Sequence, residues 1–275
     1  MSSEKLIIIS SEDKDNDSST SNSDFVVNLK EKYYTQNVLK TLVKEATVPN
    51  VFPNIRGEDY GTSQNNIIRF LEGAVQRTAI LPEGQYIISA ITATPPDPWD
   101  FVAQLNILIN AETATAVVEV TYNELTNKLE FEVTAGADVT FQTNADGSSI
   151  ISDVLGLTNS LFVPSGLGAP LPAQGTVQLS GYQNVYLHSK EIADTNAIDG
   201  DFGLISVVEP ISLADTEYNS YAYKMNCDDE LAQILYEQPR NLSRIRVTLR
   251  DNLGNILPIG TAKINFVLKA YLASG

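Results

Sequence analysis

The sequence predicts a mainly β protein, a β-sandwich or jelly roll, with an α+β segment inserted near residues 82–165. Short alternating apolar segments bounded by turn residues recur along the chain, and one segment alone has convincing helical periodicity. Charged residues make up 19% of the 275 residues, below the usual quarter, and this composition favours strands over charge-rich helices. A chain of this length can bury the core of one large β-domain or of two small ones.

The N-terminal segment is polar and acidic. Residues 10–24, SSEDKDNDSSTSNSD, lack hydrophobic periodicity, so we expect a flexible acidic arm over residues 1–24 that orders only upon assembly. The apolar run KLIII before it is too short for the core of a signal peptide, which makes secretion by that route unexpected. No apolar run approaches the roughly 20 residues that cross a bilayer, so we expect no membrane span. Regular structure is predicted to begin with a strand at 25–29.

The next elements follow from local patterns. A strand is predicted over 38–48 and ends at Pro49. The predicted helix covers 97–111, with Asp97 as N-cap and apolar residues at helical spacing. Further expected elements are strands at 65–73 and 75–81, a hairpin at 116–133, a short helix at 148–157 ended by Gly156, and strands at 182–189, 203–211, 218–225, 242–251 and 262–272. A jelly-roll domain is thereby expected over 25–81 and 166–275, around an inserted segment at 82–165.

The stretch ATVPNVFPNI, residues 46–55, alternates like a strand but contains two prolines. Proline lacks a backbone N–H and cannot donate to a sheet ladder. Pro49 and Pro53 are therefore predicted to turn the chain out of a sheet at a corner, with Val51, Phe52 and Ile55 anchoring that corner in the core. An ordinary proline-containing loop is the alternative, and both interpretations are structural.

Few residues are suited to catalysis. The chain has one histidine, His188, and one cysteine, Cys227, so an intrachain disulfide and the usual Cys/His zinc sites are excluded. The single cysteine also fits a reducing compartment. His188 alone could complete a Ser–His–Asp triad, and Cys227 with His188 is the one possible Cys–His pair. No GxSxG elbow and no glycine-rich phosphate loop is present, so we expect no enzymatic activity and no cofactor.

Acidic residues offer two weak candidate sites. The pairs in CDDE (227–230) and DGD (199–201) are more typical of turns than of acid/base catalysis. Asp13, Asp15, Asp17 and Asp24 match positions 1, 3, 5 and 12 of a calcium loop. Ser18 stands where that loop needs glycine, and strands rather than helices are expected to flank it. A mobile acidic arm is therefore favoured, and the expected number of metal sites is none.

Net charge is −16, which disfavours general nucleic-acid binding. The charge is unevenly spread: residues 191–238 are strongly acidic, and 239–275 are basic. One interpretation is balance between neighbouring strands, and the other is charge matching between subunits of a ring. Tyr221 and Tyr223 share one face of a predicted strand and could stack on a sugar. The proposed interface residues are Arg240, Arg244, Arg246 and Arg250, with Asp228, Asp229 and Glu230.

Several motifs in order carry a resemblance to a known family. DFVVNL, ATVPNVF, NNIIRF and LPEGQY are followed by TYNELTNKLEFEV, DVLGL, VYLHS and LRDNLGNIL. This series, from about residue 24 to 272, resembles capsid proteins of virophages, polinton-like viruses and related double-stranded DNA viruses. Because the major capsid proteins of that group are longer double jelly rolls, the chain is most similar to the penton, a minor capsid protein with a single jelly roll. The resemblance transfers no interface residue.

The resemblance implies a structural virion protein at the five-fold vertices, assembled inside the host cell. Expected partners are the chain itself in a homopentamer, the major capsid protein, and a host-surface glycan or receptor through the insertion. An alternative is a trimeric receptor- or glycan-binding fibre head that uses Tyr221 and Tyr223. A third hypothesis is a glycosidase on a β-sandwich, with a carboxylate pair that the sequence does not identify.

Overall fold

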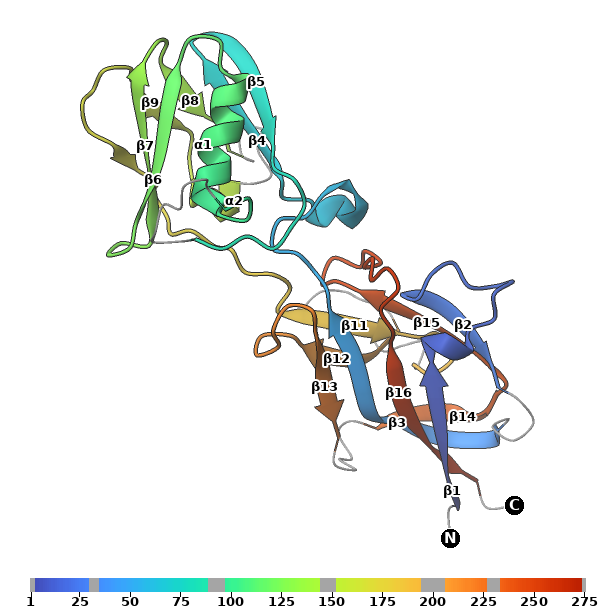
Figure 1. Ribbon diagram of the computed structural model, residues 1–275. Coiled ribbons are helices and arrows are strands. Elements are labelled where there is room, and N and C mark those ends of the chain that lie inside the picture. Colours follow the sequence, from blue (N-terminus) through green and yellow to red (C-terminus); the bar gives the residue numbers. More distant parts are fainter. Residues whose placement is uncertain are drawn as a thin grey trace. The chain divides into compact units, whose positions relative to one another are not determined.

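The computed structural model describes residues 3–29, 35–88, 97–143, 152–193, 206–226 and 233–273 (Figure 1). The chain forms two compact units. Unit 1 comprises Met1–Phe52 and Tyr182–Gly275, and unit 2 comprises Pro53–Gly181. Unit 2 is thus inserted into the chain of unit 1.

Unit 1 contains two antiparallel sheets. In the described part of the chain, one has the strand order β1-β16-β3-β13 and the other β12-β11-β15-β2, while β14 pairs with the first half of β3. These two antiparallel sheets, of five and four strands, confirm the predicted mainly β fold class. The bounds are β1 Ser3–Ser10, β2 Asp24–Asn28, β3 Thr35–Asn50, β11 Asn184–His188, β12 Val207–Ser212, β13 Ser220–Met225, β14 Ile234–Leu242, β15 Arg244–Arg250 and β16 Asn265–Leu272.

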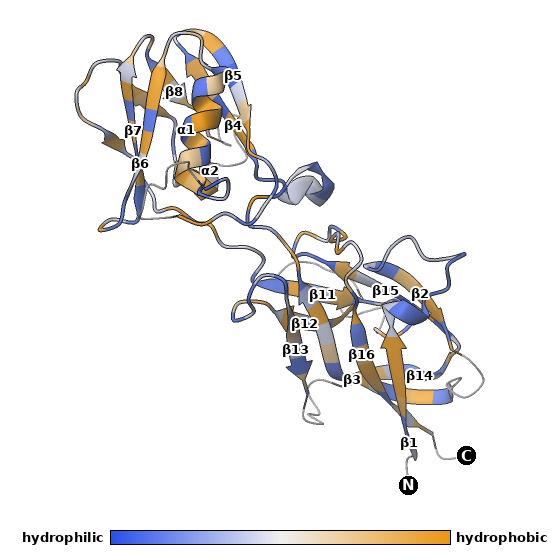
Figure 2. Ribbon diagram, in the orientation of Figure 1, coloured by the Kyte–Doolittle hydropathy of each residue, from blue (hydrophilic) through white to orange (hydrophobic). Residues whose placement is uncertain are grey.

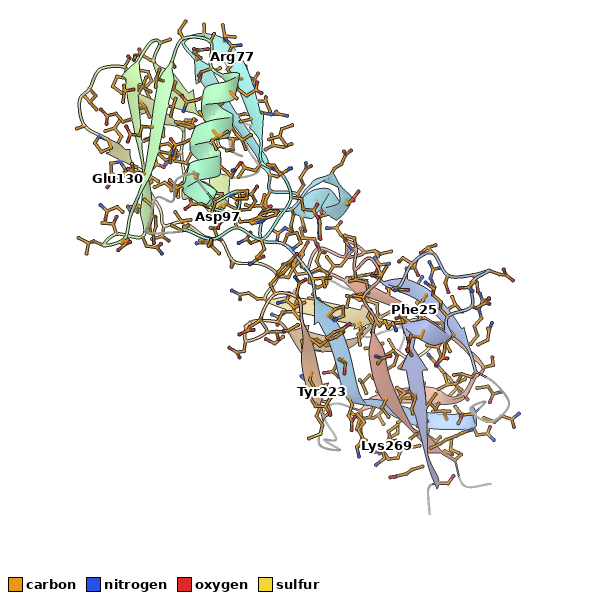
Figure 3. The ribbon with its side chains drawn as sticks, viewed as in Figure 1. Phe25, Arg77, Asp97, Glu130, Tyr223 and Lys269 are labelled. Atoms are coloured by element: carbon orange, nitrogen blue, oxygen red, sulfur yellow. The ribbon has the colours of Figure 1, made fainter. Side chains whose placement is uncertain are left out.

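The core of unit 1 follows from strand alternation. In β1, Ile7 and Ile9 are fully buried while Leu6 and Ile8 are exposed. The second sheet supplies residues such as Phe25 on β2, labelled in Figure 3, and Leu249 on β15, both fully buried. Two apolar sheet faces buried in this way are the main source of stability in a sandwich.

The N-terminal arm prediction is corrected by β1. Residues 3–10 pair antiparallel with β16, from Ser3 opposite Leu272 to Ser10 opposite Asn265. The following turns are also fixed, because the Asp15 N–H donates to the Val26 carbonyl and the Asn22 amide to the Ala262 carbonyl. The sequence did not reveal this because the partner strand lies at the other end of the chain.

Unit 2 also contains two antiparallel sheets in its described residues, ordered β5-β4-β8-β9 and β10-β7-β6. Helix α1 packs against β6 and β5 (Figure 1). Figure 2 shows the alternating hydrophobic and hydrophilic stretches of α1, whose residues Phe101, Leu105 and Ile109 are buried. The bounds are β4 Ile67–Glu72, β5 Val75–Ile80, α1 Phe101–Glu112, β6 Val117–Asn123, β7 Lys128–Ala135, β8 Val139–Phe141, α2 Ser152–Leu155, β9 Leu161–Val163 and β10 Leu171–Pro172, with 3-10 turns at Ser11–Asp13 in unit 1 and Glu58–Ser63 in unit 2.

The structure moves the boundaries predicted for the insertion. The strands predicted at 65–73 and 75–81 were assigned to the jelly roll, but they are β4 and β5 of unit 2. Phe70 on β4 contacts Phe141 of β8, with ring centroids 5.9 Å apart, and both belong to one buried cluster with Phe101. The Gly/Pro-rich segment 163–175 also lies in unit 2. The insertion is therefore 53–181 rather than 82–165.

Two predicted elements of unit 2 are confirmed, one with a shifted start. The hairpin at 116–133 is β6 and β7. The predicted helix exists, but its N-cap is Asp100, whose side chain accepts from the Ala103 N–H at 3.0 Å. Asp97 instead accepts from the Trp99 N–H in the preceding turn. Both aspartates satisfy cap-like geometry locally, and the sequence pattern does not distinguish them.

The two prolines lie beside the boundary between the units. Pro49 is still in register with β13, opposite Tyr221, and β3 ends one residue later. Phe52 is buried in unit 1, whereas Ile55 belongs to the buried cluster of unit 2 and Val51 is only partly buried. The chain thus leaves the sheet between the prolines, but the predicted anchors serve two different cores.

No helix among the described residues has the length and apolar character needed to cross a membrane.

Candidate functional site

The basic residues predicted at an interface are largely engaged within the chain. Arg246 on β15 forms a two-pronged ion pair with Asp24 on β2, with Nε–Oδ1 at 2.8 Å and Nη2–Oδ2 at 2.7 Å. This guanidinium holds the pKa of the Asp24 carboxyl below its usual value. Neighbouring strands β15 and β2 are therefore linked by charge, although Asp24 lies outside the acidic segment 191–238 whose balance with residues 239–275 the sequence suggested.

Two further arginines also have partners inside unit 1. Arg250 donates to the Gly254 carbonyl at 2.6 Å, and Arg240 donates to the Ala193 carbonyl at 3.1 Å. The Arg240 guanidinium also lies 4.6 Å from the centre of the Tyr236 ring. Arg244 is exposed on β15. The predicted acidic partners Asp228, Asp229 and Glu230 lie outside the described residues, so their charge matching stays a prediction.

The structure does not assemble the calcium pattern. Asp15 accepts from the side chains of Ser18 at 2.6 Å and Asn28 at 2.7 Å, which lower the pKa of its carboxyl, while Asp24 is bound by Arg246. Among the described residues no group of three His, Cys, Asp or Glu side chains is placed to hold a metal ion. The Asp15 carboxylate therefore belongs to a hydrogen-bonded turn, and Asp24 belongs to strand β2.

Of the candidate nucleophile pair Cys227–His188, only His188 is among the described residues. His188 lies on β11 and is buried, at 6% exposed. Cys227 and the acids of CDDE and DGD lie outside the described part of the chain.

An ion pair between a buried carboxylate and an exposed lysine links the two sheets of unit 1. The Glu209 carboxylate on β12 is 3.2 Å from Nζ of Lys224 on β13, and it accepts a hydrogen bond from the Asn226 amide at 2.9 Å. Burial raises the pKa of Glu209, and Lys224 opposes that rise. Sequence reasoning missed this pair because β12 and β13 belong to different sheets.

One face of the first sheet of unit 1 carries several exposed apolar and aromatic side chains. We call it the outer face and define it by Leu6 and Ile8 of β1, Val267 of β16, and Tyr221, Tyr223 and Met225 of β13. Five of these side chains are more than half exposed: Leu6 53%, Ile8 61%, Tyr221 52%, Tyr223 61% and Met225 56%. Figure 2 shows β1 as a strongly hydrophobic strand, and Figure 3 labels Tyr223 on β13 and Lys269 on β16.

The strand registers make the outer face continuous. Ile8 lies opposite Val267, Val267 opposite Glu45 of β3, and Glu45 opposite Met225, so one row crosses all four strands. The neighbouring row runs from Asn265 through Thr47 to Tyr223. The face therefore extends from the β1 edge of the sheet to the β13 edge.

The charges along the outer face are mostly compensated. Lys269 pairs with Glu4 at 3.0 Å, and Lys263 pairs with Glu12. Lys269 also lies 5.0 Å from the centre of the Tyr271 ring. Desolvation and the nearby Glu45 carboxylate raise the pKa of Tyr223, which keeps its hydroxyl neutral. The face is thus close to neutral, with apolar or aromatic side chains on β1, β16 and β13 and polar side chains on β3.

Comparison with known proteins finds a structural counterpart. The crystal structure of the mavirus penton protein matches with a TM-score of 0.50 over 98% of this chain and 99% of that chain, at 8% sequence identity. This chain shares the fold of a viral penton protein. No family model matches the sequence, and no curated protein matches it significantly. The likeness supports the jelly-roll assignment on grounds independent of the sequence motifs.

Proposed function

We propose that this chain is a structural virion protein, a penton or minor capsid protein that forms the five-fold vertices of an icosahedral capsid. The observation that carries this proposal is the fold shared with the mavirus penton protein over nearly the full length of both chains. The architecture of unit 1 supports it, because two antiparallel sheets interrupted by one inserted unit are compatible with a single jelly roll.

The proposed role is structural and depends on how the subunits fit together. A head-to-tail interface between identical subunits closes a ring, and burial of apolar surface stabilises it. The partners are four further copies of the chain and the major capsid protein, and the site of action is the virion after assembly inside the host cell. The role needs no reaction, cofactor or metal, and we propose none.

The mass of the purified chain in solution tests the proposal. Light scattering after size exclusion, over a range of concentration and salt, is expected to give five times the chain mass of 30.0 kDa. Three times that mass would contradict the five-fold vertex and favour a fibre head. A monomer at every concentration would refute the proposal that the ring assembles without other capsid proteins.

A glycan-binding attachment module is the second candidate. Tyr221 and Tyr223 favour it, because two exposed aromatic rings on alternate residues of one strand can stack on a sugar. A glycan array with the wild type and with Tyr223→Ala is the test, and loss of a specific signal in the variant would support it. Hydrolysis of any glycan on the array would instead support the glycosidase hypothesis.

A further inference from the structure

The outer face has the composition of a buried contact rather than of a solvated surface. Exposed apolar residues scattered singly are normal, but contiguous apolar patches of several hundred Å² mark interaction sites. The outer face places six apolar or aromatic side chains on β1, β16 and β13 of one sheet, with Glu45 and Thr47 of β3 between them, and five of the six are more than half exposed. Something other than water is expected to cover it.

The size of the outer face suits the centre of a protein interface. Four strands spaced about 4.8 Å apart are about 19 Å wide, and six residues of a strand are about 20 Å long. The projected area of the outer face is therefore about 400 Å², against about 800 Å² per partner in a standard interface. The outer face would fill the central half of such an interface, and the ion pairs Glu4–Lys269 and Glu12–Lys263 would lie in the polar rim.

Charge decides between possible occupants. The chain has a net charge of −16, so two copies repel each other over most of their surface. Contact between copies is most favourable where a surface is close to neutral and exposes apolar side chains, and the outer face has both properties. A basic partner would instead bind where carboxylates gather. In the two rows described above, the outer face has one carboxylate, that of Glu45.

We infer that the outer face of the β1-β16-β3-β13 sheet is the surface by which one copy of this chain contacts the next. This inference rests on the proposed self-assembly and names its surface. The contact is head-to-tail, so the outer face of one copy meets a different surface of its neighbour.

The test compares charged substitutions on and off the face by light scattering. Ile8→Asp and Met225→Lys introduce opposite charges at the two edges of the outer face, so a shared effect cannot come from net charge. Leu125→Asp and Leu253→Lys are matched controls, because both leucines are strongly exposed and lie outside the face. Each face variant is expected to raise the dissociation constant of the assembly by about 30-fold or more, and each control by less than about twofold.

A milder substitution tests the face in chains that still fold. Ile8→Cys is made in a Cys227→Ser background, so that the new thiol is the one cysteine. It is expected to react with a soluble thiol reagent at least about tenfold more slowly in the assembly than in dissociated chains, whereas Leu125→Cys should react equally in both. If the wild type assembles while face variants keep its dissociation constant and Ile8→Cys stays reactive, the outer face is not the contact, although the proposed function survives. If the wild type remains a single chain throughout, self-assembly fails and the inference fails with it.

Discussion

The carboxylate of Glu72 is predicted to hold much of the stability of unit 2. Glu72 ends β4, and its side chain is 4% exposed. It accepts backbone N–H bonds from Ala114 at 2.9 Å, Thr115 at 2.6 Å and Ala116 at 2.8 Å, and it forms an ion pair with Arg77 at 2.9 Å. One side chain thereby fixes the turn between α1 and β6 to the end of β4.

The expected loss follows from the donors left behind. Glu72→Ala removes the acceptor of three consecutive N–H groups, and the buried donor of Ala116 left without a partner costs about 1–3 kcal/mol. Ala114 and Thr115 are exposed, so water can restore part of their loss, and with the ion pair to Arg77 also removed we expect a total loss of about 3 kcal/mol in the free energy of unfolding of unit 2. Arg77→Met removes only the partly exposed cation and should cost about 1 kcal/mol.

Tryptophan fluorescence gives a probe confined to unit 2. The chain has one tryptophan, Trp99, which packs against Tyr86 with ring centroids 5.7 Å apart. Urea unfolding followed at this fluorophore at pH 7 therefore reports the free energy of unit 2. Glu124→Ala is the matched control, because Glu124 is exposed in the turn of the β6–β7 hairpin and its loss should change the free energy by less than about 0.5 kcal/mol.

The same carboxylate makes a prediction about pH. The backbone N–H groups and Arg77 hold the pKa of Glu72 far below its ordinary value of 4.5. A depressed folded-state pKa means that the stabilisation is complete above the unfolded value and is lost as pH falls below it. The difference in unfolding free energy between wild type and Glu72→Gln should therefore be constant from pH 8 to about pH 6 and shrink as the pH is lowered through about 4.

Two results would refute the reasoning on Glu72. A loss below about 1 kcal/mol in Glu72→Ala would mean that water satisfies the three N–H groups without cost. A difference between wild type and Glu72→Gln that does not change with pH would mean that the charge of the carboxylate contributes nothing.

Three further substitutions test other contacts. Gly136→Ala should cost about 3 kcal/mol by urea unfolding, because φ is +88° and a Cβ would lie 2.0 Å from the Thr115 carbonyl oxygen. Glu132→Thr should stabilise unit 2 by about 0.5 kcal/mol at low salt, since Glu132 lies directly opposite Glu119 in the β6–β7 ladder; an equal gain at high salt would contradict this cause. Asp251→Ala should lower the melting temperature of unit 1 measured by circular dichroism, because this fully buried carboxylate accepts two N–H bonds from the turn after it; an unchanged melting temperature would contradict that role.

Local patterns predicted local structure well. The β6–β7 hairpin and the helix α1 depend on alternation or periodicity within about 20 residues, and the structure confirms both. The fold class followed because short strands recur along the chain. Strand β14 was not predicted, since Pro239 interrupts its pattern and its pairing with β3 contains register shifts.

Long-range pairing could not be predicted. The sequence KLIII was assigned to the acidic arm because its partner strand, β16, lies more than 250 residues away in the chain. The predicted limits of the insertion were wrong for the same reason. Strand β4 is recognised as part of unit 2 only through its pairing with β8 and its place in the buried cluster. The candidate site depends on these same pairings. The sequence placed Tyr221 and Tyr223 on one face of a strand, but it did not reveal the sheet face that they share with Leu6 and Ile8.

The insertion is compatible with the jelly roll because its two ends leave unit 1 at one place. Phe52 and Tyr182, the last and first residues of unit 1 around the insertion, pack edge to face with ring centroids 5.6 Å apart. For unit 1, residues 53–181 are therefore equivalent to a loop with neighbouring ends, and such loops tolerate inserted domains at small entropic cost. Unit 2 in turn has its own buried cluster of aromatic and aliphatic side chains, so it does not need the sandwich to complete its core. The two prolines of ATVPNVFPNI fit this division: Pro49 lies in the last pairs of β3, and Pro53 begins the chain of the inserted unit.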